Sequence, residues 1–208
     1  MTAGRRLRFI RDERAGATIE FVALMPAFLL LTFFIFEVGV AILWVGTAEK
    51  AVQLGARLAI VSNYAVTGLT PTSTNSLAGG SFIYGQRCSA GACTPFATQT
   101  CIAGTSAQCD STNFTTIVNR MASLSNLIQS QYVTITYTYI GLGYAGGPLV
   151  PGVTVTLAGV PYGAVVTTIL GSFMKLATGN QSASSPFSTL PTITVTLTGE
   201  DLNTAGAP

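Results

Sequence analysis

Residues 15–44 read AGATIEFVALMPAFLLLTFFIFEVGVAILW, and this stretch decides how the rest of the chain is organised. It is apolar apart from Glu20 near its start and Glu37 late in it, and the sixteen residues between these two carboxylates carry no charge. A helix needs about 20 apolar residues to cross a hydrocarbon core of about 30 Å. The stretch therefore predicts a transmembrane helix, with a short basic segment on one side of the membrane and the remaining chain on the other.

The composition favours an exported domain after this helix. Of the 208 residues, 49% are hydrophobic, only 9% are charged and none is histidine, whereas about 25% of residues are charged in ordinary soluble domains. Ser, Thr, Asn and Gln must therefore make the surface polar. The length that remains after one membrane span suits one modest core, so we expect one soluble domain over residues 63–208.

The distribution of charge predicts the topology. The first sixteen residues carry five arginines against Asp12 and Glu13, a net charge of +3, and the charges after Trp44 are spread out and roughly balanced. An excess of Lys and Arg beside a span marks the cytoplasmic side. Residues 1–16 are therefore expected to be a cytoplasmic leader, with the C-terminal domain periplasmic or extracellular. Nucleic-acid binding is a weaker interpretation of the arginines, because no basic or aromatic surface accompanies them.

A cleavable secretory signal is the first alternative for this N-terminal region. Residues 46–48 (GTA) offer small side chains of the kind that signal peptidase accepts. The apolar stretch is, however, far longer than the usual 7 to 15 residues. It also contains two carboxylates, each of which costs several kcal/mol at membrane depth. A signal peptide gives no reason for that cost.

A different kind of processing segment does explain a carboxylate near the start of the apolar stretch. Residues 14–21 (RAGATIEF) combine a basic residue, small residues, a short apolar stretch, a glutamate and an aromatic residue, as prepilin-like proteins do. Residues 11–62 as a whole resemble the TadE-like pseudopilins of the tight-adherence (Tad/Flp) pilus machinery. Glu20, Phe21, Pro26, Glu37 and the small-residue segment ending at Arg57 stand in corresponding places.

The resemblance implies that a prepilin peptidase cuts the chain on its cytoplasmic side, among Ala15, Gly16 and Ala17. The family usually places its cleavage-site glycine five residues before the glutamate, but here Ala15 occupies that position and Gly16 follows it. The bonds Gly16–Ala17 and Ala15–Gly16 both remain open, with the first preferred. After the cut, Glu20 would lie one turn into the helix, where it can pair with the new α-amino group of a neighbouring subunit.

Two other positions in the span bear on assembly. Pro26 is expected to kink the helix, because its ring removes one backbone hydrogen bond and clashes one turn back. Glu37 either faces a protein partner in the membrane, which would help subunit packing, or reaches the outer interface by a shift of the helix. The sequence leaves both interpretations of Glu37 open.

The resemblance also implies a function and a set of partners. The expected protein is a structural minor pseudopilin-like subunit that acts in Tad/Flp pilus biogenesis from the bacterial inner membrane, as a single-pass protein. Its partners would be the prepilin peptidase, the Tad inner-membrane platform, other pseudopilins and the Flp-type pilin. Two alternatives remain: a pseudopilin or minor pilin of another type IV pilus or type II secretion system, and a membrane-tethered exported domain for binding or adhesion.

The helix is expected to continue beyond the membrane. From Thr47 to Ser62 the apolar residues gather on one side, with Glu49, Lys50 and Arg57 on the other, which is a helical amphipathic spacing. Residues 17–62 are therefore predicted to form one helix, a membrane span with a periplasmic stalk extension. At 1.5 Å per residue its length would be about 65 Å.

Four cysteines follow in a loop predicted over residues 79–110. Cys88, Cys93, Cys101 and Cys109 have the spacing C-x4-C-x7-C-x7-C. Zinc sites favour closer pairs, often helped by histidine, so no metal is expected here. An even count in an exported Gly/Ser/Thr-rich segment predicts two disulfides. Three pairings are possible, and sequential pairing is weakly preferred.

The remaining patterns predict an α+β domain of the pilin or pseudopilin type. Residues 110–129 have the apolar spacing of a helix, with Asp110 or Ser111 as its N-cap. About three antiparallel strands are expected from alternating β-branched residues at 132–139, 153–157 and 192–197. Residues 163–178 are apolar without a clear period and are expected to be irregular or partly helical.

Catalysis is not expected from this sequence. A hydrolase or transferase needs a base near neutral pKa, an activated nucleophile or a metal. The chain has no histidine, and its carboxylates beyond the membrane are isolated in sequence. Residues 141–147 (GLGYAGG) follow a predicted strand but lead into Pro148 and lack the lysine of a phosphate-binding loop. We therefore expect a non-enzymatic protein without a cofactor.

Overall fold

The computed structural model describes residues 13–69, 84–103, 107–163 and 189–199, together with six single positions between 168 and 179. The chain forms two compact units, one of Met1–Leu43 with Tyr162–Ser188 and one of Trp44–Pro161 with Thr189–Pro208. The predicted cytoplasmic leader up to residue 12 lies outside the described residues, as does most of the segment predicted over 163–178.

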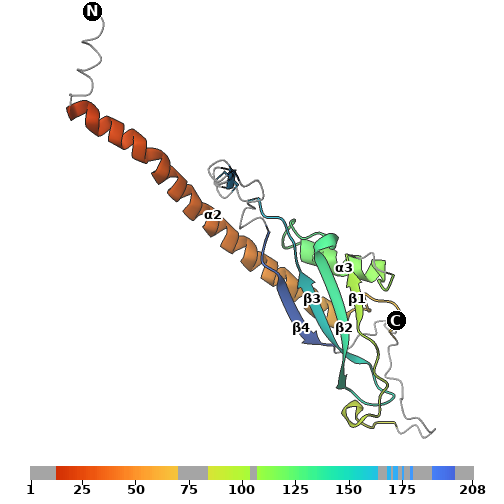
Figure 1. Cartoon of the computed structure of the whole chain (residues 1–208). Coiled ribbons are helices and arrows are strands. Elements are labelled where there is room, and N and C mark those ends of the chain that lie inside the picture. Colours follow the sequence, from red (N-terminus) through yellow and green to blue (C-terminus); the bar gives the residue numbers. More distant parts are fainter. Residues whose placement is uncertain are drawn as a thin grey trace, which may run out of the picture. The chain divides into compact units, whose positions relative to one another are not determined.

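One long helix, α2, runs from Glu13 to Val61 (Figure 1). Its 49 residues correspond to about 74 Å at 1.5 Å per residue. Pro26 lies inside the helix. From Thr18 to Val61 the helix is long and apolar enough to cross a membrane, and none of its most apolar 18-residue window is buried in the protein. The prediction of one continuous helix through the apolar run and its amphipathic extension is confirmed.

The second unit contains a four-stranded antiparallel sheet in the order β1-β2-β3-β4 (Figure 1). The strands are β1 Gln99–Ile102, β2 Val133–Leu142, β3 Val150–Leu157 and β4 Ile193–Thr198. The sequence predicted the last three and missed β1. The register between β2 and β3 shifts between Tyr139 and Leu142, where Gly141 adopts a φ of 70°, a conformation that glycine allows without a side-chain clash.

The two faces of the sheet differ in chemistry, as the alternation in sequence predicts. One face points into the core and carries the buried side chains Val133, Ile135, Tyr137, Val153, Val155 and Leu157. The other face carries threonines from all four strands, among them Thr100, Thr136, Thr154 and Thr196, which lie opposite one another in a single row. Three Thr–Thr hydrogen bonds link neighbouring strands on this face, at 2.9–3.3 Å.

The second helix of the unit, α3, spans Ser111–Ala122 and is shorter than the predicted 110–129. Asp110 is its N-cap, and one carboxylate oxygen accepts hydrogen bonds from the backbone N–H groups of Thr112 and Asn113, both at 3.0 Å. The helix ends where the Ser123 hydroxyl donates to the carbonyl of Arg120 at 2.7 Å. Serine competes in this way with the helical backbone, and Leu124, predicted as part of the apolar face, is 49% exposed.

The last third of α2 belongs to the core of this unit. Ala48, Ala51, Val52, Ala56 and Ala59 are all buried on one side of it, while the predicted polar side, with Glu49, Lys50 and Arg57, is exposed. These small side chains allow a close approach between α2 and α3. A Cβ added at Gly55 would overlap the Sδ atom of Met121 and lie 2.8 Å from its Cγ atom.

Two tyrosines close one end of the core. The backbone N–H of Ala65 donates to the Tyr137 hydroxyl at 3.1 Å, and the rings of Tyr64 and Tyr137 meet edge to face with centroids 5.7 Å apart. Burial raises the pKa of Tyr137 to about 12, and the pKa of Tyr64 is raised to about 12 by burial and by the neighbouring Tyr137. Both phenols therefore stay neutral at physiological pH.

Candidate functional site

The predicted processing residues lie in the first turns of α2. Ala15, Gly16 and Ala17 have helical backbone. Glu20 and Phe21 are exposed on the same helix, and Glu20 follows Gly16 by four residues, so the two positions share one helix face one turn apart. The structure thus places Glu20 one helical turn after the backbone at which a cut is predicted.

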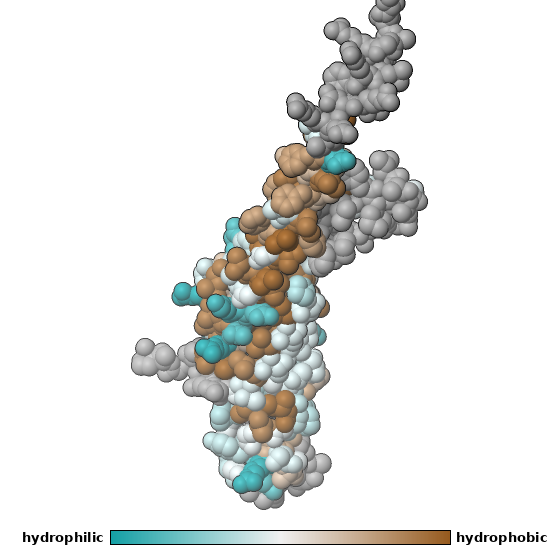
Figure 2. All heavy atoms as spheres, turned by 90° about the vertical axis from the view of Figure 1, so that its left-hand side faces the viewer, coloured by the Kyte–Doolittle hydropathy of each residue, from teal (hydrophilic) through white to brown (hydrophobic). Residues whose placement is uncertain are grey.

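The apolar surface that follows is the largest exposed hydrophobic feature of the described residues. Figure 2 shows it as brown side chains along this part of the helix. Its members are large and are exposed on all sides of the helix: Ile19, Phe21, Val22, Leu24, Met25, Phe28, Leu29, Leu30, Leu31, Phe33, Phe34, Ile35, Phe36, Val38, Val40, Ile42 and Leu43. An apolar surface of this extent marks a membrane or protein contact. The chemistry fits a helix that lies in lipid or packs against other apolar helices.

The Glu37 region has a contact that the sequence did not predict. The Tyr162 hydroxyl donates to the backbone carbonyl of Glu37 at 2.9 Å, across 125 positions in sequence, and Glu37 is partly buried. Glu37 follows Glu20 by 17 positions, which places the two carboxylates about 100° apart around the helix axis. One neighbouring helix therefore cannot face both of them squarely.

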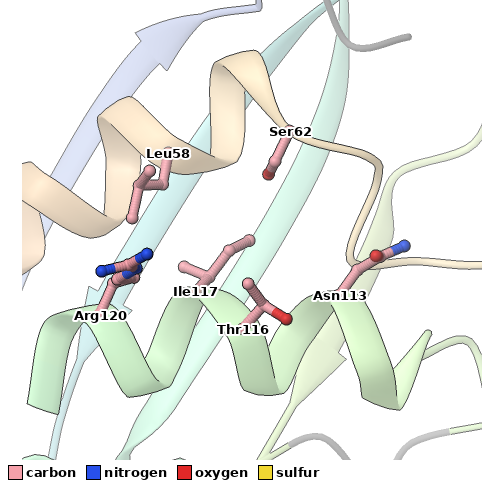
Figure 3. Close-up of a pocket in the computed structure, with 6 residues that line it drawn as sticks. All are labelled: Leu58, Ser62, Asn113, Thr116, Ile117 and Arg120. Carbon is pink, nitrogen blue, oxygen red and sulfur yellow. The ribbon is translucent and has the colours of Figure 1, made fainter. Parts of the chain in front are cut away.

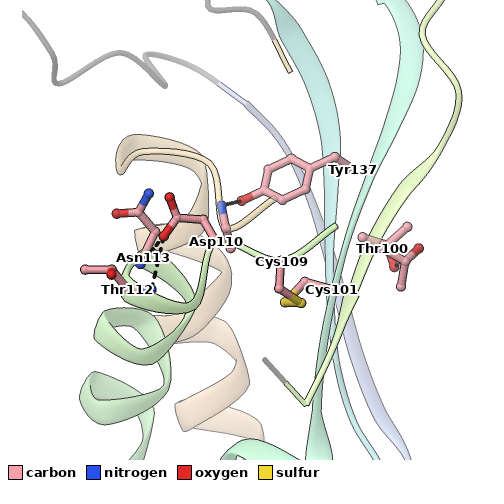
Figure 4. Close-up of a disulfide and its surroundings, with 9 residues drawn as sticks. Thr100, Cys101, Cys109, Asp110, Thr112, Asn113 and Tyr137 are labelled. Atoms are coloured by element: carbon pink, nitrogen blue, oxygen red, sulfur yellow. Dashed lines mark hydrogen bonds between the residues drawn. A yellow bond between two sulfur atoms is a disulfide. The ribbon is translucent and has the colours of Figure 1, made fainter. Parts of the chain in front are cut away.

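The four cysteines form two disulfides in the sequential pairing. Cys88 is bonded to Cys93, with Cα atoms 4.7 Å apart, and Cys101 to Cys109, with Cα atoms 4.9 Å apart. The second disulfide joins β1 to the residue just before the N-cap of α3 (Figure 4). The first lies in a small cluster of buried residues with Ala92 and Ala145, against which Tyr139 packs. The second bond therefore ties the start of α3 to the sheet, and the first closes a short loop on itself.

A groove of about 210 Å³ lies between the end of α2 and α3. Figure 3 shows Leu58 and Ser62 on one wall and Asn113, Thr116, Ile117 and Arg120 on the other. The polar groups are engaged locally: the Asn113 amide donates to the Tyr64 carbonyl at 3.0 Å and the Thr116 hydroxyl to the Thr112 carbonyl at 2.9 Å. The groove is therefore mainly apolar, and Arg120 is the charged side chain among the six residues that line it.

Metal ligands do not gather in the part of the chain that the structure describes. No group of three or more His, Cys, Asp or Glu side chains there is placed to hold a metal ion. The cysteines, which are the softest ligands in the chain, are all engaged in disulfides. The described chemistry therefore centres on the apolar helix with its two carboxylates and on the surfaces of the sheet unit.

Comparison with known proteins agrees with the chemistry of the helix. Residues 16–57 match the family model described as TadE-like protein. No match was found among curated proteins, and none among solved structures. The matched segment begins at Gly16, next to the predicted cut, and covers the apolar run together with the buried part of α2 up to Arg57. The match agrees with the resemblance noted in the sequence: residues 16–57, about a fifth of the chain, are similar to TadE-like proteins.

Proposed function

We propose that this protein is a structural, non-enzymatic minor pseudopilin-like subunit that acts in Tad/Flp pilus biogenesis after processing by a prepilin peptidase. The observation that carries the proposal is the TadE-like match over residues 16–57. It coincides with a helix whose apolar side chains are exposed up to Leu43 and buried from Ala48 onward. Such a helix can hold the chain in a membrane or fibre by its first part and carry the sheet unit by its second.

The cut proposed at Gly16–Ala17, with Ala15–Gly16 as the alternative bond, would create a new charge beside Glu20. The basic leader keeps this point on the cytoplasmic side by the positive-inside rule. The freed α-amino group of one subunit would then pair with the Glu20 carboxylate of its neighbour. In a low-dielectric surrounding such a pair is far stronger than in water. Before the cut no such amino group exists, so processing would switch assembly on.

The proposed partners follow from this role. They are the prepilin peptidase, the Tad inner-membrane platform, other pseudopilins and the Flp-type pilin. The protein would be a single-pass inner-membrane protein with its N-terminus in the cytoplasm and its sheet unit in the periplasm or in the fibre. The two disulfides support an oxidising location for that unit. Co-purification with the Tad platform, compared with platforms of other pilus or secretion systems, tests the assignment of partners.

The mature N-terminus tests the processing step. Protein taken from the membranes of cells with an active prepilin peptidase should begin at Ala17 or Gly16, and protein from cells that lack the peptidase should keep its leader. Intact mass and N-terminal sequencing distinguish these species. A start near Glu49 would identify an ordinary signal peptide, and an intact Met1 or Thr2 in peptidase-positive cells would leave only a membrane anchor. Either result overturns the proposal.

Two variants separate the cut from the assembly that follows it. Gly16→Leu should block cleavage, because a bulky side chain hinders approach of the peptidase to the backbone. Glu20→Gln should still be cut but should lose co-purification with neighbouring pilus subunits. Glu37→Gln, on the same helix, tests separately whether the second carboxylate takes part in subunit packing: co-purification at the wild-type level would favour its place at the outer interface. Loss of both steps, or of neither, in Glu20→Gln would contradict the proposed role of this carboxylate.

A further inference from the structure

A long connection joins two neighbouring strands of the sheet. Antiparallel neighbours can be joined by a turn of a few residues, but residues 158–192 separate β3 from β4. The connection is closed at its base. Pro161 forms an antiparallel bridge with Thr189, and the Leu190 N–H donates to the Val160 carbonyl at 2.9 Å. Connections of this length often carry function, so the residues inside the closed base are candidates for a binding role.

The connection belongs with the apolar part of α2. Tyr162–Ser188 forms one compact unit with Met1–Leu43, and the Tyr162 hydroxyl donates to the Glu37 carbonyl at 2.9 Å. A hydrocarbon core of about 30 Å takes up about 20 helical residues. A core that starts at Glu20 therefore ends just beyond Glu37, which lies about 5 Å inside its far boundary. The connection thus meets α2 where lipid chains give way to headgroups.

Part of the connection is helical. Thr168, Ile169, Gly171, Ser172 and Lys175 have helical backbone. The Ser172 hydroxyl donates to the Thr168 carbonyl at 2.9 Å, one turn back, as serine does within helices. These described positions set a period of about 3.6 residues for the sequence around them.

At this period the sequence of residues 165–178, VVTTILGSFMKLAT, divides into two sides. One half of the circumference carries all the apolar residues of the stretch, with Phe173 near its centre. The other half carries the threonines, the serine, the glycine and Lys175. The apolar residues come in adjacent groups, so the division is seen only once the helical positions are known. Ile169 lies on the apolar side and is 42% exposed.

We propose that residues 165–178 bind the surface of the membrane that α2 spans, as a helix in the plane of the interface with its apolar side toward lipid. Such a helix buries its apolar face about 5–10 Å into the boundary between headgroups and acyl chains, which matches the depth of the contact between Tyr162 and Glu37. Tyrosine is enriched at this level, because its ring is apolar and its hydroxyl polar. Lys175 on the polar side keeps its charge among the headgroups.

Exposure on both elements favours lipid over protein as the partner. The apolar side chains of α2 around Glu37 are not covered: Phe33, Val38 and Val40 are 40–56% exposed, and Ile169 of the connection is 42% exposed. Two apolar surfaces of one unit are therefore open side by side in sequence-distant elements that the Tyr162 hydroxyl joins. The hydrocarbon of a single membrane satisfies both of them.

The inference requires that α2 crosses a membrane, and it goes beyond the proposed pilus role. The test uses the full chain in vesicles of phosphatidylethanolamine and phosphatidylglycerol. All four native cysteines are in disulfides, so one added cysteine can be labelled alone with the fluorophore NBD. Nitroxide groups on the lipids quench a label that lies in lipid, and iodide quenches a label that lies in water.

Ile169→Cys is compared with Thr168→Cys, because the two positions are adjacent and both exposed but lie about 100° apart on the helix, on opposite sides. Nitroxides near the headgroups should quench the Ile169→Cys label severalfold more than the Thr168→Cys label, and iodide should quench it less. Nitroxides at the chain ends should quench the Ile169→Cys label less than those near the headgroups, because the helix lies in the interface. Leu31→Cys, in the middle of the span, should show the reverse order of depth.

A second substitution tests whether the apolar side carries the binding. Phe173→Ser added to Ile169→Cys should lower quenching by the lipid nitroxides severalfold, whereas Thr178→Ser on the polar side should leave it unchanged. Protection of the Ile169→Cys label from both quenchers would show that protein covers this side, and equal iodide quenching at positions 168 and 169 would place the segment in water. Either result overturns the proposal. So would unchanged quenching in the Phe173→Ser variant, or a Leu31→Cys label that lipid nitroxides do not reach.

Discussion

The first and last parts of α2 belong to one helix but bury their side chains in opposite ways. In the first part, up to Leu43, the side chains are large, and residues such as Leu24, Ile35 and Leu43 are 64–70% exposed. In the last part the apolar residues are mainly small and lie on one side, and Ala51, Val52 and Ala56 are 0% exposed. Helix periodicity is the same in both parts. Side-chain size and the presence of a polar side separate a helix that needs lipid or other helices from one that packs on its own sheet.

The largest difference between the two parts is expected when an aspartate is placed in each of them. Val52→Asp puts an unpaired carboxylate into the core and should destabilise the sheet unit by more than about 4 kcal/mol. The same change in the first part, Ile35→Asp, should leave the unfolding of that unit unchanged. It should instead weaken retention in the membrane, by about 3 kcal/mol at mid-bilayer depth.

Near-UV circular dichroism of the full chain in detergent measures the first effect, and membrane fractionation measures the second. Wild-type protein is the reference in both. Equal loss of folded signal in the two variants would contradict the division of the helix. So would full membrane retention of Ile35→Asp together with a destabilised sheet unit.

Glycine substitutions test the role of small residues in the last part. Gly55→Leu must displace Met121, which is 0% exposed, and overpacking of this kind should cost about 2–3 kcal/mol. Gly39→Leu is the matched control, because among the described residues no atom outside the local helix backbone and the chain neighbours lies within 4 Å of a Cβ added at Gly39. We expect its unfolding midpoint in detergent to equal that of the wild type. A neutral Gly55→Leu would show that α2 and α3 can separate without loss of stability.

Much of this fold follows from local patterns in the sequence. The apolar run predicts α2, strict alternation predicts β2, β3 and β4, and Asp110 is found at the predicted N-cap. The strand β1 was missed because its four residues, QTCI, carry little pattern of their own and acquire strand structure by pairing with β2. The end of α3 was misjudged because apolar spacing continues past Ser123 while the local hydrogen bonding does not.

The features of the candidate site were likewise predicted where they are local in sequence and missed where they join distant residues. The resemblance of residues 14–21 to processing segments points to Gly16 and Glu20, both local features. The contact of Tyr162 with Glu37 joins residues 125 apart, and no single-sequence pattern signals it. The groove beside Arg120 was missed for the same reason, since its two walls come from helices separated by the cysteine-containing segment.

Alkaline pH should act on the sheet unit through Tyr137, whose side chain lies in the core of that unit. The pKa of Tyr137 is about 12 in the folded protein and about 10 in an unfolded chain. The unfolded state therefore loses its proton first. The stabilisation is complete below about pH 10 and is lost as the pH rises toward 12, by up to about 2 kcal/mol.

Thermal unfolding followed between pH 8 and 11.5 measures this dependence. Tyr137→Phe should make the unfolding temperature depend less on pH. It should also lower stability at pH 8, because the Ala65 N–H loses its acceptor. The remaining slope belongs to Tyr64, whose pKa is also about 12. Tyr84→Phe is the control, because Tyr84 is 77% exposed. A Tyr137→Phe profile as steep as that of the wild type would contradict the assignment.

The smallest expected effect comes from the cap of α3, the helix that covers the last part of α2 at Gly55. Asp110→Ala removes the oxygen that accepts from the N–H groups of Thr112 and Asn113, and loss of such a cap costs about 1 kcal/mol. Asp110→Asn keeps an acceptor oxygen and should lose only a few tenths of that, from the weaker interaction with the helix dipole. Both should leave membrane retention unchanged, because Asp110 belongs to the sheet unit and the exposed apolar side chains of α2 belong to the other unit. Denaturant unfolding of the three proteins in the same detergent gives the comparison, and equal losses for the two variants would show that charge, and not hydrogen bonding, stabilises this end of α3.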